Sequence, residues 1–163
     1  MSKKRSVILK TSVNFRKYIL LVFLCLLPLS GGCGRDERLD VYKSGMEQFY
    51  ADIIAYDEVI NSIDVESETS VQELLEALDN LEACFTQMAA LSVPKEFSVI
   101  ESLAAEAGEY MSQAVALYHL AYESTPFDTA AAQAAKEYYD RANKRAVYML
   151  SILHGEIPEG LDM

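Results

Sequence analysis

Three carboxylates on alternate positions of one short polar stretch are the clearest candidates for chemistry in this chain. Asp64, Glu66 and Glu68 lie within five residues, and carboxylate oxygens are the ligands that hard cations such as calcium prefer. The stretch lacks the glycine and the terminal glutamate of an EF-hand loop. We therefore expect a contact site for a protein partner or a weakly held cation, or else a solvated acidic loop.

The histidines and the remaining cysteine do not form a catalytic or metal-binding pattern. Metal sites inside helical bundles use a glutamate three residues before a histidine, but Ala116 and Ser151 hold that place before His119 and His154. Cys84 lies next to carboxylates, which raise a thiol pKa, so we expect it to be a small buried residue. The Cys-x-x-Cys-His haem motif is absent from the sequence. We predict no catalytic residue, no metal ligand and no cofactor.

The distribution of charge divides the chain into two parts. Residues 1–32 hold six basic residues and no acidic one, whereas residues 33–163 hold 25 acidic and 8 basic residues, a formal charge of −17. No basic residue lies between Lys43 and Lys95. Because binding to nucleic acid needs a basic surface that displaces counterions from phosphates, we exclude nucleic acid as a partner.

The first 32 residues have the order of parts found in an export signal. A basic stretch that ends at Arg16 and Lys17 precedes nine apolar residues, 19–27, which are followed by a proline and small residues. A helix needs about 20 apolar residues to cross a bilayer, so this short stretch indicates a removable signal peptide and not a permanent span.

Residues 29–33, with the sequence LSGGC, resemble the lipobox of bacterial lipoproteins. The resemblance covers only the first 33 residues. It implies cleavage between Gly32 and Cys33, attachment of diacylglycerol to the Cys33 thiol and often acylation of the new amino terminus. Two or three acyl chains anchor a protein stably to a membrane, whereas one chain is marginal. The implied location is the outer face of the bacterial cell membrane, or the periplasmic side of an envelope membrane.

A plain secretory signal is the alternative for the same residues. Cleavage near Gly31 or Gly32 would then leave Cys33 as a free thiol, and the protein would be secreted. In the lipidated form the lipid occupies the Cys33 thiol, and Cys84 is the only other cysteine in the exported part. An internal disulfide is therefore not expected in that form.

Apolar side chains recur every three or four residues in four stretches, as they do on the buried face of a helix. The stretches cover residues 39–63, 71–88, 97–121 and 132–153. No strand pattern competes with them. The predicted fold is therefore all-α, an antiparallel up-down-up-down four-helix bundle over residues 38–155.

Cap residues and alanine content refine this prediction. Ser70 and Glu73 form a capping box for the second helix, Asp128 is the expected N-cap of the fourth, and Gly155 its C-terminal cap. The third and fourth stretches are rich in alanine, so their backbones are expected to approach each other closely.

The short segment between Cys33 and the first helix predicts how the bundle stands on the membrane. Residues 33–37 form a lipidated tether of at most about 15 Å. In this arrangement residues 64–70 and 124–128 point away from the lipid, and residues 156–163 form a flexible tail. Most basic residues fall toward the membrane end.

The function expected from these observations is binding or scaffolding in the cell envelope, without catalysis. The lipid anchor binds the membrane, and the acidic distal end is the expected contact for a protein partner. The alternative is a carrier that holds a small ligand or a cation such as calcium, either inside the bundle or on the acidic loop formed by residues 64–68. The sequence does not indicate the oligomeric state.

Overall fold

A computed structural model describes residues 37–158 of the chain. These residues form α3 (Glu37–Ser62), α4 (Ser70–Ala89), the short 3-10 helix η2 (Lys95–Phe97), α5 (Ser98–Glu123) and α6 (Thr129–Leu153). No strand occurs among them, so the predicted all-helical fold is confirmed. In this part of the chain no helix is both long and apolar enough to span a membrane.

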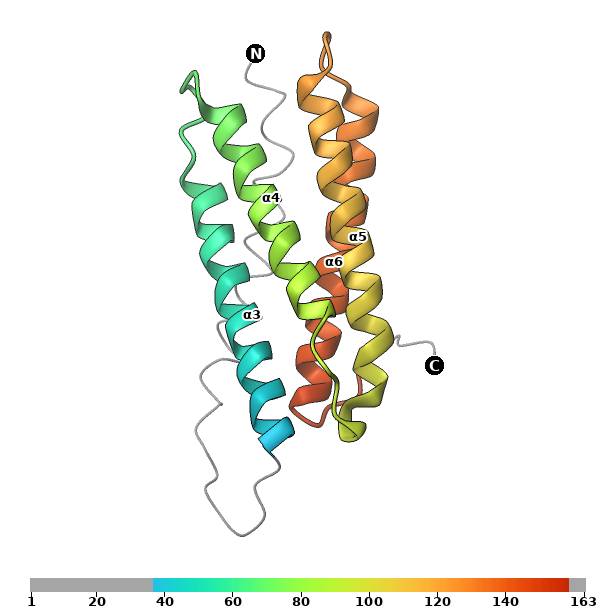
Figure 1. Ribbon diagram of the computed structural model, residues 1–163. Helices are drawn as coiled ribbons and strands as arrows, with labels where there is room; N and C mark the ends of the chain where they lie inside the picture. Colours follow the sequence, from blue (N-terminus) through green and yellow to red (C-terminus); the bar gives the residue numbers. More distant parts are fainter. Residues whose placement is uncertain (1–36, 159–163) are drawn as a thin grey trace.

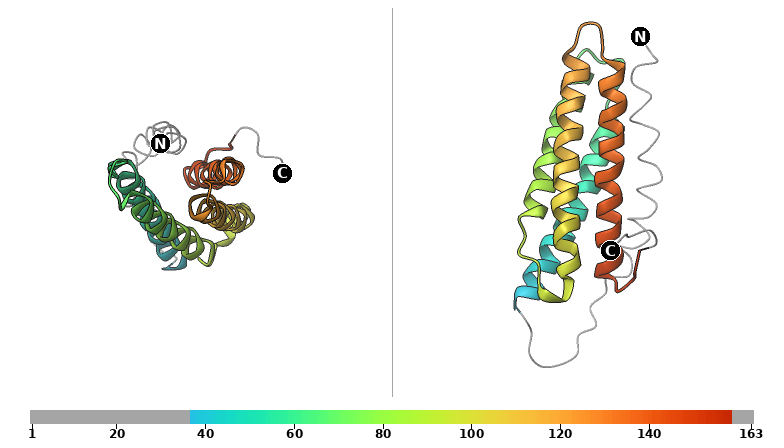
Figure 2. Two further views of the ribbon diagram at one scale, coloured as in Figure 1. Left: turned by 90° about the horizontal axis from the view of Figure 1, so that it is seen from above. Right: turned by 90° about the vertical axis from the view of Figure 1, so that its right-hand side faces the viewer.

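The four helices pack in the order in which they follow one another. Figures 1 and 2 show α3 beside α4 and α5 beside α6, with α4 and α5 joining the two pairs. The loops at residues 63–69 and 124–128 lie at one end, whereas the first turn of α3 and the last turn of α6 lie at the other (Figure 1). The hydroxyl of Tyr50 on α3 donates to the carbonyl oxygen of Ala146 on α6, at 2.8 Å.

The size of the buried side chains differs between the two helix pairs. Bulky residues fill the space around α3 and α4, where the rings of Phe49 and Phe85 meet edge to face at 5.0 Å. Among the described helices the contact between α5 and α6 is the most extensive. Alanine side chains dominate the contact between α5 and α6, which confirms the close approach expected from the sequence. The buried alanines of these two helices are Ala104, Ala107, Ala114, Ala121, Ala131, Ala132, Ala135, Ala142 and Ala146.

The predicted caps of α6 are both confirmed. The Asp128 carboxylate accepts hydrogen bonds from the backbone N–H groups of Ala130, at 2.9 Å, and Ala131, at 3.0 Å. Gly155 has a φ of 78°, which an L side chain rarely adopts. Its N–H donates to the Ile152 carbonyl, as expected when a left-handed residue ends a helix.

The predicted capping box at the start of α4 is not formed. Ser70 begins the helix, but its side chain is buried and its hydroxyl has no hydrogen-bond partner in the described part of the chain. Thr69 precedes the helix, and its hydroxyl donates to the Glu73 carboxylate at 2.5 Å. Because Ser70 is buried, it does not act as the cap, and Thr69 bonds the Glu73 side chain and not a backbone N–H of the first turn.

Several predictions fall outside residues 37–158. The signal peptide, the cleavage site at Gly32 and Cys33, the tether before Glu37 and the end of the predicted tail belong to parts of the chain that the structure does not describe.

Candidate functional site

The acidic loop between α3 and α4 presents its carboxylates to solvent. Asp64, Glu66 and Glu68 are all exposed. The Asp64 carboxylate accepts a hydrogen bond from the backbone N–H of Glu66 at 3.0 Å, so it stabilises the turn. Within residues 37–158 no group of three His, Cys, Asp or Glu side chains converges as metal ligands would. The loop therefore offers an exposed negative surface at the end of the bundle opposite the start of α3 (Figure 1).

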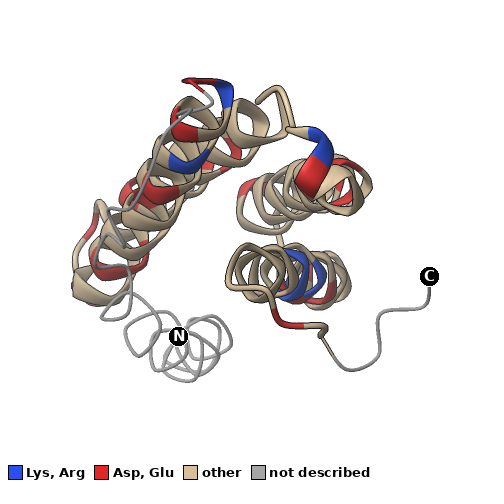
Figure 3. Cartoon of the chain, turned by 90° about the horizontal axis from the view of Figure 1, so that it is seen from below, with Lys and Arg blue, Asp and Glu red and all other residues tan. Residues whose placement is uncertain are grey.

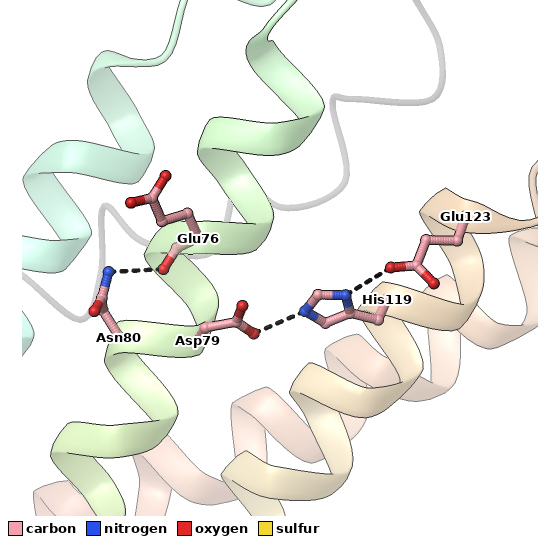
Figure 4. A network of polar contacts seen from close by, with 5 residues as sticks. All are labelled: Glu76, Asp79, Asn80, His119 and Glu123. Carbon is pink, nitrogen blue, oxygen red and sulfur yellow. Dashed lines mark hydrogen bonds and ion pairs between the residues drawn. The ribbon is translucent and has the colours of Figure 1, made fainter.

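A histidine between two carboxylates joins α4 to α5 (Figure 4). The Nε2 atom of His119 on α5 lies 2.7 Å from Oδ1 of Asp79 on α4, and its Nδ1 atom lies 2.9 Å from Oε1 of Glu123. Glu123 is one helical turn beyond His119, so the helix itself brings these two together. Asp79 is 40 residues away in sequence and meets His119 only through the packing of α4 on α5.

The two carboxylates raise the pKa of His119 above its ordinary value of 6.5. The hydrogen bond with Glu123 is the largest cause and that with Asp79 the second, while partial burial opposes them. A protonated imidazole donates from both ring nitrogens, whereas a neutral one donates from only one. His119 can therefore hold a proton, and its protonated form joins α4 to α5 more firmly than its neutral form.

A second cluster gathers cations and aromatic rings along α5 and α6, with Arg141 and Lys144 exposed and Tyr148 buried. We call it the basic–tyrosine face, and define it as Tyr110, Tyr138, Arg141, Lys144, Arg145 and Tyr148. The Arg141 guanidinium lies 5.4 Å from the centre of the Tyr138 ring, and the Lys144 ammonium lies 5.3 Å from that of Tyr148. Such cation–π contacts contribute about 0.5–1 kcal/mol each at exposed sites.

The cations of this face differ in how they are neutralised. The Nε atom of Arg145 lies 2.6 Å from Oε2 of Glu106, which is an ion pair between α6 and α5. Arg141 and Lys144 are exposed and form no ion pair with any residue of the described part. On α6 the members of this face follow one another at intervals of three or four residues, so the sequence could have shown that they share one side of the helix: Tyr138, Arg141, Arg145 and Tyr148. Tyr110 lies on α5, and no spacing in the sequence links it to them.

Cys84 is buried between α4 and α3, as the sequence predicted. Its side chain is 7% exposed, and its Sγ atom lies 3.8 Å from the carbonyl oxygen of Phe49. Burial, with a smaller effect from the nearby Asp52 charge, raises the pKa of Cys84 to about 12. The thiol is therefore protonated at neutral pH and is unsuited to nucleophilic chemistry.

Comparison with protein-family models, with characterised proteins and with solved structures finds no match to this chain.

Proposed function

We propose that this chain is a lipid-anchored protein of the bacterial cell envelope whose helical bundle binds or scaffolds a protein partner and catalyses no reaction. The observation that carries the proposal is the LSGGC sequence ending at Cys33, which resembles a lipobox and follows a basic and an apolar stretch. Only the anchor depends on this resemblance. The binding role rests on the charge and exposure of the bundle.

The orientation of the bundle follows from the anchor. We propose an antiparallel up-down-up-down arrangement in which the start of α3, close to Cys33, faces the membrane. Residues 63–69 and 124–128 then face away from it, in keeping with their place at the opposite end in Figure 1. A tether of at most about 15 Å keeps the near end close to the lipid.

The proposed partner contact is the acidic loop at the far end, with Asp64, Glu66 and Glu68. All three side chains are exposed, and no basic residue occurs from residue 44 to residue 94. An extended negative surface attracts a partner of opposite charge and speeds their encounter. The loop is thus suited to a basic protein surface that lies beyond the membrane.

Membrane partition of a Cys33→Ala variant tests the anchor. We expect the wild-type chain in the membrane fraction and the processed variant in the soluble fraction, because the variant lacks the acylated thiol. A processed variant that stayed with the membrane would contradict the lipid anchor. Mass spectrometry of the wild-type amino-terminal peptide measures the acyl mass directly.

Cross-linking in intact cells tests the partner contact. We expect a cross-linked protein with the wild type, and its loss when Glu66 and Glu68 are both changed to lysine. The matched control changes Glu96 and Glu101 to lysine, which alters the net charge equally at the opposite end of the bundle. Equal cross-linking by all three proteins would contradict a contact at the loop. A melting temperature raised by calcium would instead favour a cation carrier.

A further inference from the structure

The side of the bundle between α3 and α6 lacks the close helix packing found elsewhere. Among the described helices, α3 packs on α4, α4 on α5 and α5 on α6, whereas α3 and α6 hardly approach each other. Figure 3, which looks along the bundle from the end where α3 begins, shows the two helix pairs as separate arms. The hydroxyl of Tyr50 bridges them by donating to the Ala146 carbonyl oxygen. A group that lies on this side can therefore be reached without separating two closely packed helices.

Two buried polar side chains lie on this side together with a tyrosine. Asp57 on α3 is 4% exposed, and Asn143 on α6 is 9% exposed. Seven residues, about two helical turns, separate Tyr50 from Asp57 and Ala146 from Tyr139. In the proposed antiparallel arrangement, Asp57 therefore stands level with Tyr139. Asn143 follows Tyr139 by four residues and shares its face of α6.

The electrostatics of Tyr139 links these three side chains. Burial raises the pKa of Tyr139 above its ordinary value, the nearby charge of Asp57 raises it further, and a hydrogen bond with the Asn143 side chain opposes both. The Oδ1 atom of Asn143 is itself buried and has no hydrogen-bond partner in the described part of the chain. Because a buried acceptor without a donor is unfavourable, this oxygen is a place where a ligand can bind by donating.

The chemistry of the cluster favours a cation that carries N–H groups. A buried carboxylate needs an opposite charge or several hydrogen bonds to compensate for its lost hydration. Asp57 already takes part in an interaction, but a carboxylate has about four acceptor positions on its two oxygens, so it can accept further donors. The face of an aromatic ring such as that of Tyr139 also attracts cations. An ammonium group suits all of these neighbours, because it combines a positive charge with N–H donors.

The surroundings of Asp57 narrow the ligand further. Ile53 and Ile60 are buried on α3, one turn before and one turn after Asp57, where they can contact an alkyl chain. Within residues 37–158 no three side chains of the metal-binding types converge, so a metal ion would find too few protein ligands at Asp57. The formal charge of −15 on the described residues attracts cations in general. These features together fit a small organic cation.

We propose that Asp57, Tyr139 and Asn143 form a binding site for an alkylammonium group, carried either by a free small amine or by a lysine side chain of a partner protein. In this amine site the Asp57 carboxylate supplies the opposite charge, Asn143 Oδ1 accepts an N–H, and the alkyl chain lies against the isoleucines of α3. The amine site is separate from the acidic loop and does not depend on the lipid anchor. Its geometry rests on the proposed antiparallel arrangement of α3 and α6.

Nuclear magnetic resonance of the processed full chain in a nonionic detergent tests the amine site. n-Butylammonium chloride replaces potassium chloride at constant ionic strength, so that general screening does not change. We expect saturable shifts of the Asn143 side-chain amide and of the backbone amides around Asp57, with a dissociation constant of about 1 mM or lower for so small a ligand. n-Butanol, which lacks the charge, and tetramethylammonium, which lacks N–H donors, should bind at least about tenfold more weakly.

Three variants separate the amine site from the general charge of the domain. Asp57→Asn keeps the shape but removes the charge, and should weaken butylammonium binding about tenfold to a hundredfold. Asn143→Leu removes the acceptor and should weaken binding about tenfold, yet without ligand it should resist urea at least as well as the wild type, because a buried atom without a partner is gone. Glu58→Gln is the matched control, since Glu58 is exposed beside Asp57 on α3, and it should bind as the wild type does. Circular dichroism verifies the helical content of each variant.

A peptide distinguishes the two sources of the ammonium group. It is acetylated and amidated at its ends and carries one lysine between two alanines, so that the side-chain amine is the only ammonium. Binding tighter than that of butylammonium identifies a lysine of a partner protein as the ligand. Weaker binding identifies a free amine. Either result supports the amine site.

The amine site would be refuted by the absence of a saturable shift with both ligands, by equally tight binding of butanol, or by Asp57→Asn and Glu58→Gln having the same affinity. The titration involves neither a membrane nor Glu66 and Glu68. Such a result would therefore contradict the amine site alone, while the proposed anchor and loop contact keep their own tests.

Discussion

His119 shows how much a single side chain depends on its neighbours in this protein. In the sequence His119 lacks the preceding glutamate of a bundle metal site, and the structure places it between Asp79 and Glu123 with both ring nitrogens in hydrogen bonds. Its side chain is 33% exposed and that of Asp79 54%, so solvent screens the interaction. The consequence is a modest contribution to stability that depends on pH.

Replacing His119 with glutamine should remove that pH-dependent stability. The folded pKa of His119 lies above the unfolded value of 6.5, so its contribution is complete below about pH 6.5 and is lost as the pH rises through the folded pKa. We expect the variant to be less stable than the wild type by at most about 1 kcal/mol at acidic pH, and equal to it at alkaline pH. Urea unfolding over this range measures the difference.

Asp79→Asn separates the two hydrogen bonds of the network. It weakens the link between α4 and α5 but leaves the bond with Glu123, so the same pH trend should remain with a smaller amplitude. A difference between wild type and His119→Gln that did not change with pH would show that the proton has no role in stability.

Cys84 should be unreactive while the protein is folded. Its burial and a pKa raised to about 12 leave almost no accessible thiolate at neutral pH. We expect thiol reagents to modify Cys84 in the folded domain only at the rate at which the protein opens, and immediately in urea. Fast labelling of the native Cys33→Ala variant, in which Cys84 is the remaining exported cysteine, would contradict the buried position.

At the scale of the elements, the pairing of α5 with α6 depends on the absence of side-chain bulk. Ala107, Ala114 and Ala142 are completely buried, so the two backbones lie too close for larger residues. Interiors of this kind are packed as densely as organic crystals, and added carbon atoms force side chains or backbone to move.

Ala107→Leu should therefore destabilise the fold by about 1–3 kcal/mol through overpacking. Ala105→Leu is the matched control, because Ala105 is exposed on the same helix and the substitution has the same effect on helix propensity. We expect the control to stay within about 0.5 kcal/mol of the wild type. Guanidinium unfolding followed by circular dichroism measures both; similar losses in the two variants would argue against the tight α5–α6 contact.

The helix ends depend both on the chemistry of the cap residue and on whether its side chain is free to act as a cap. Asp128 caps α6 because its carboxylate reaches the N–H groups of the first turn, which any helix leaves without an internal partner. Ser70 has the right chemistry for a cap but turns into the core, and the Thr69 hydroxyl bonds the Glu73 carboxylate and no backbone N–H. Packing thus removed one predicted cap without removing the helix that follows.

At the scale of the whole molecule, like charge is the dominant long-range force. The described residues carry 22 acids against seven bases, a formal charge of −15. Such an excess repels itself in the compact state, and salt screens the repulsion over a length of about 10 Å at 0.1 M.

We therefore expect the melting temperature of the domain to rise as sodium chloride increases from about 10 mM to about 200 mM at pH 7.5. Scanning calorimetry measures it. The Lys95→Glu variant, which increases the negative charge, should respond more strongly to salt than the wild type. A melting temperature that fell with salt would mean that specific ion pairs outweigh the general repulsion.

The sequence by itself determined the helices, most of their ends and the close approach of α5 and α6. These features depend on residues within one or two turns of each other: the three-to-four spacing of apolar side chains, cap residues beside the first and last turns, and alanine in two of the four stretches. The lipid anchor and the acidic loop were also predicted from local patterns, and they remain predictions.

Only the tertiary structure decided which side chains meet across helices. His119 and Asp79, or Tyr110 and Arg141, are brought together by the rotation of each helix about its own axis, which the packing of every core residue determines jointly. A spacing along one chain segment cannot specify that rotation. The basic–tyrosine face could therefore not be predicted from the sequence, because its residues on α5 and α6 come together only when the two helices pack.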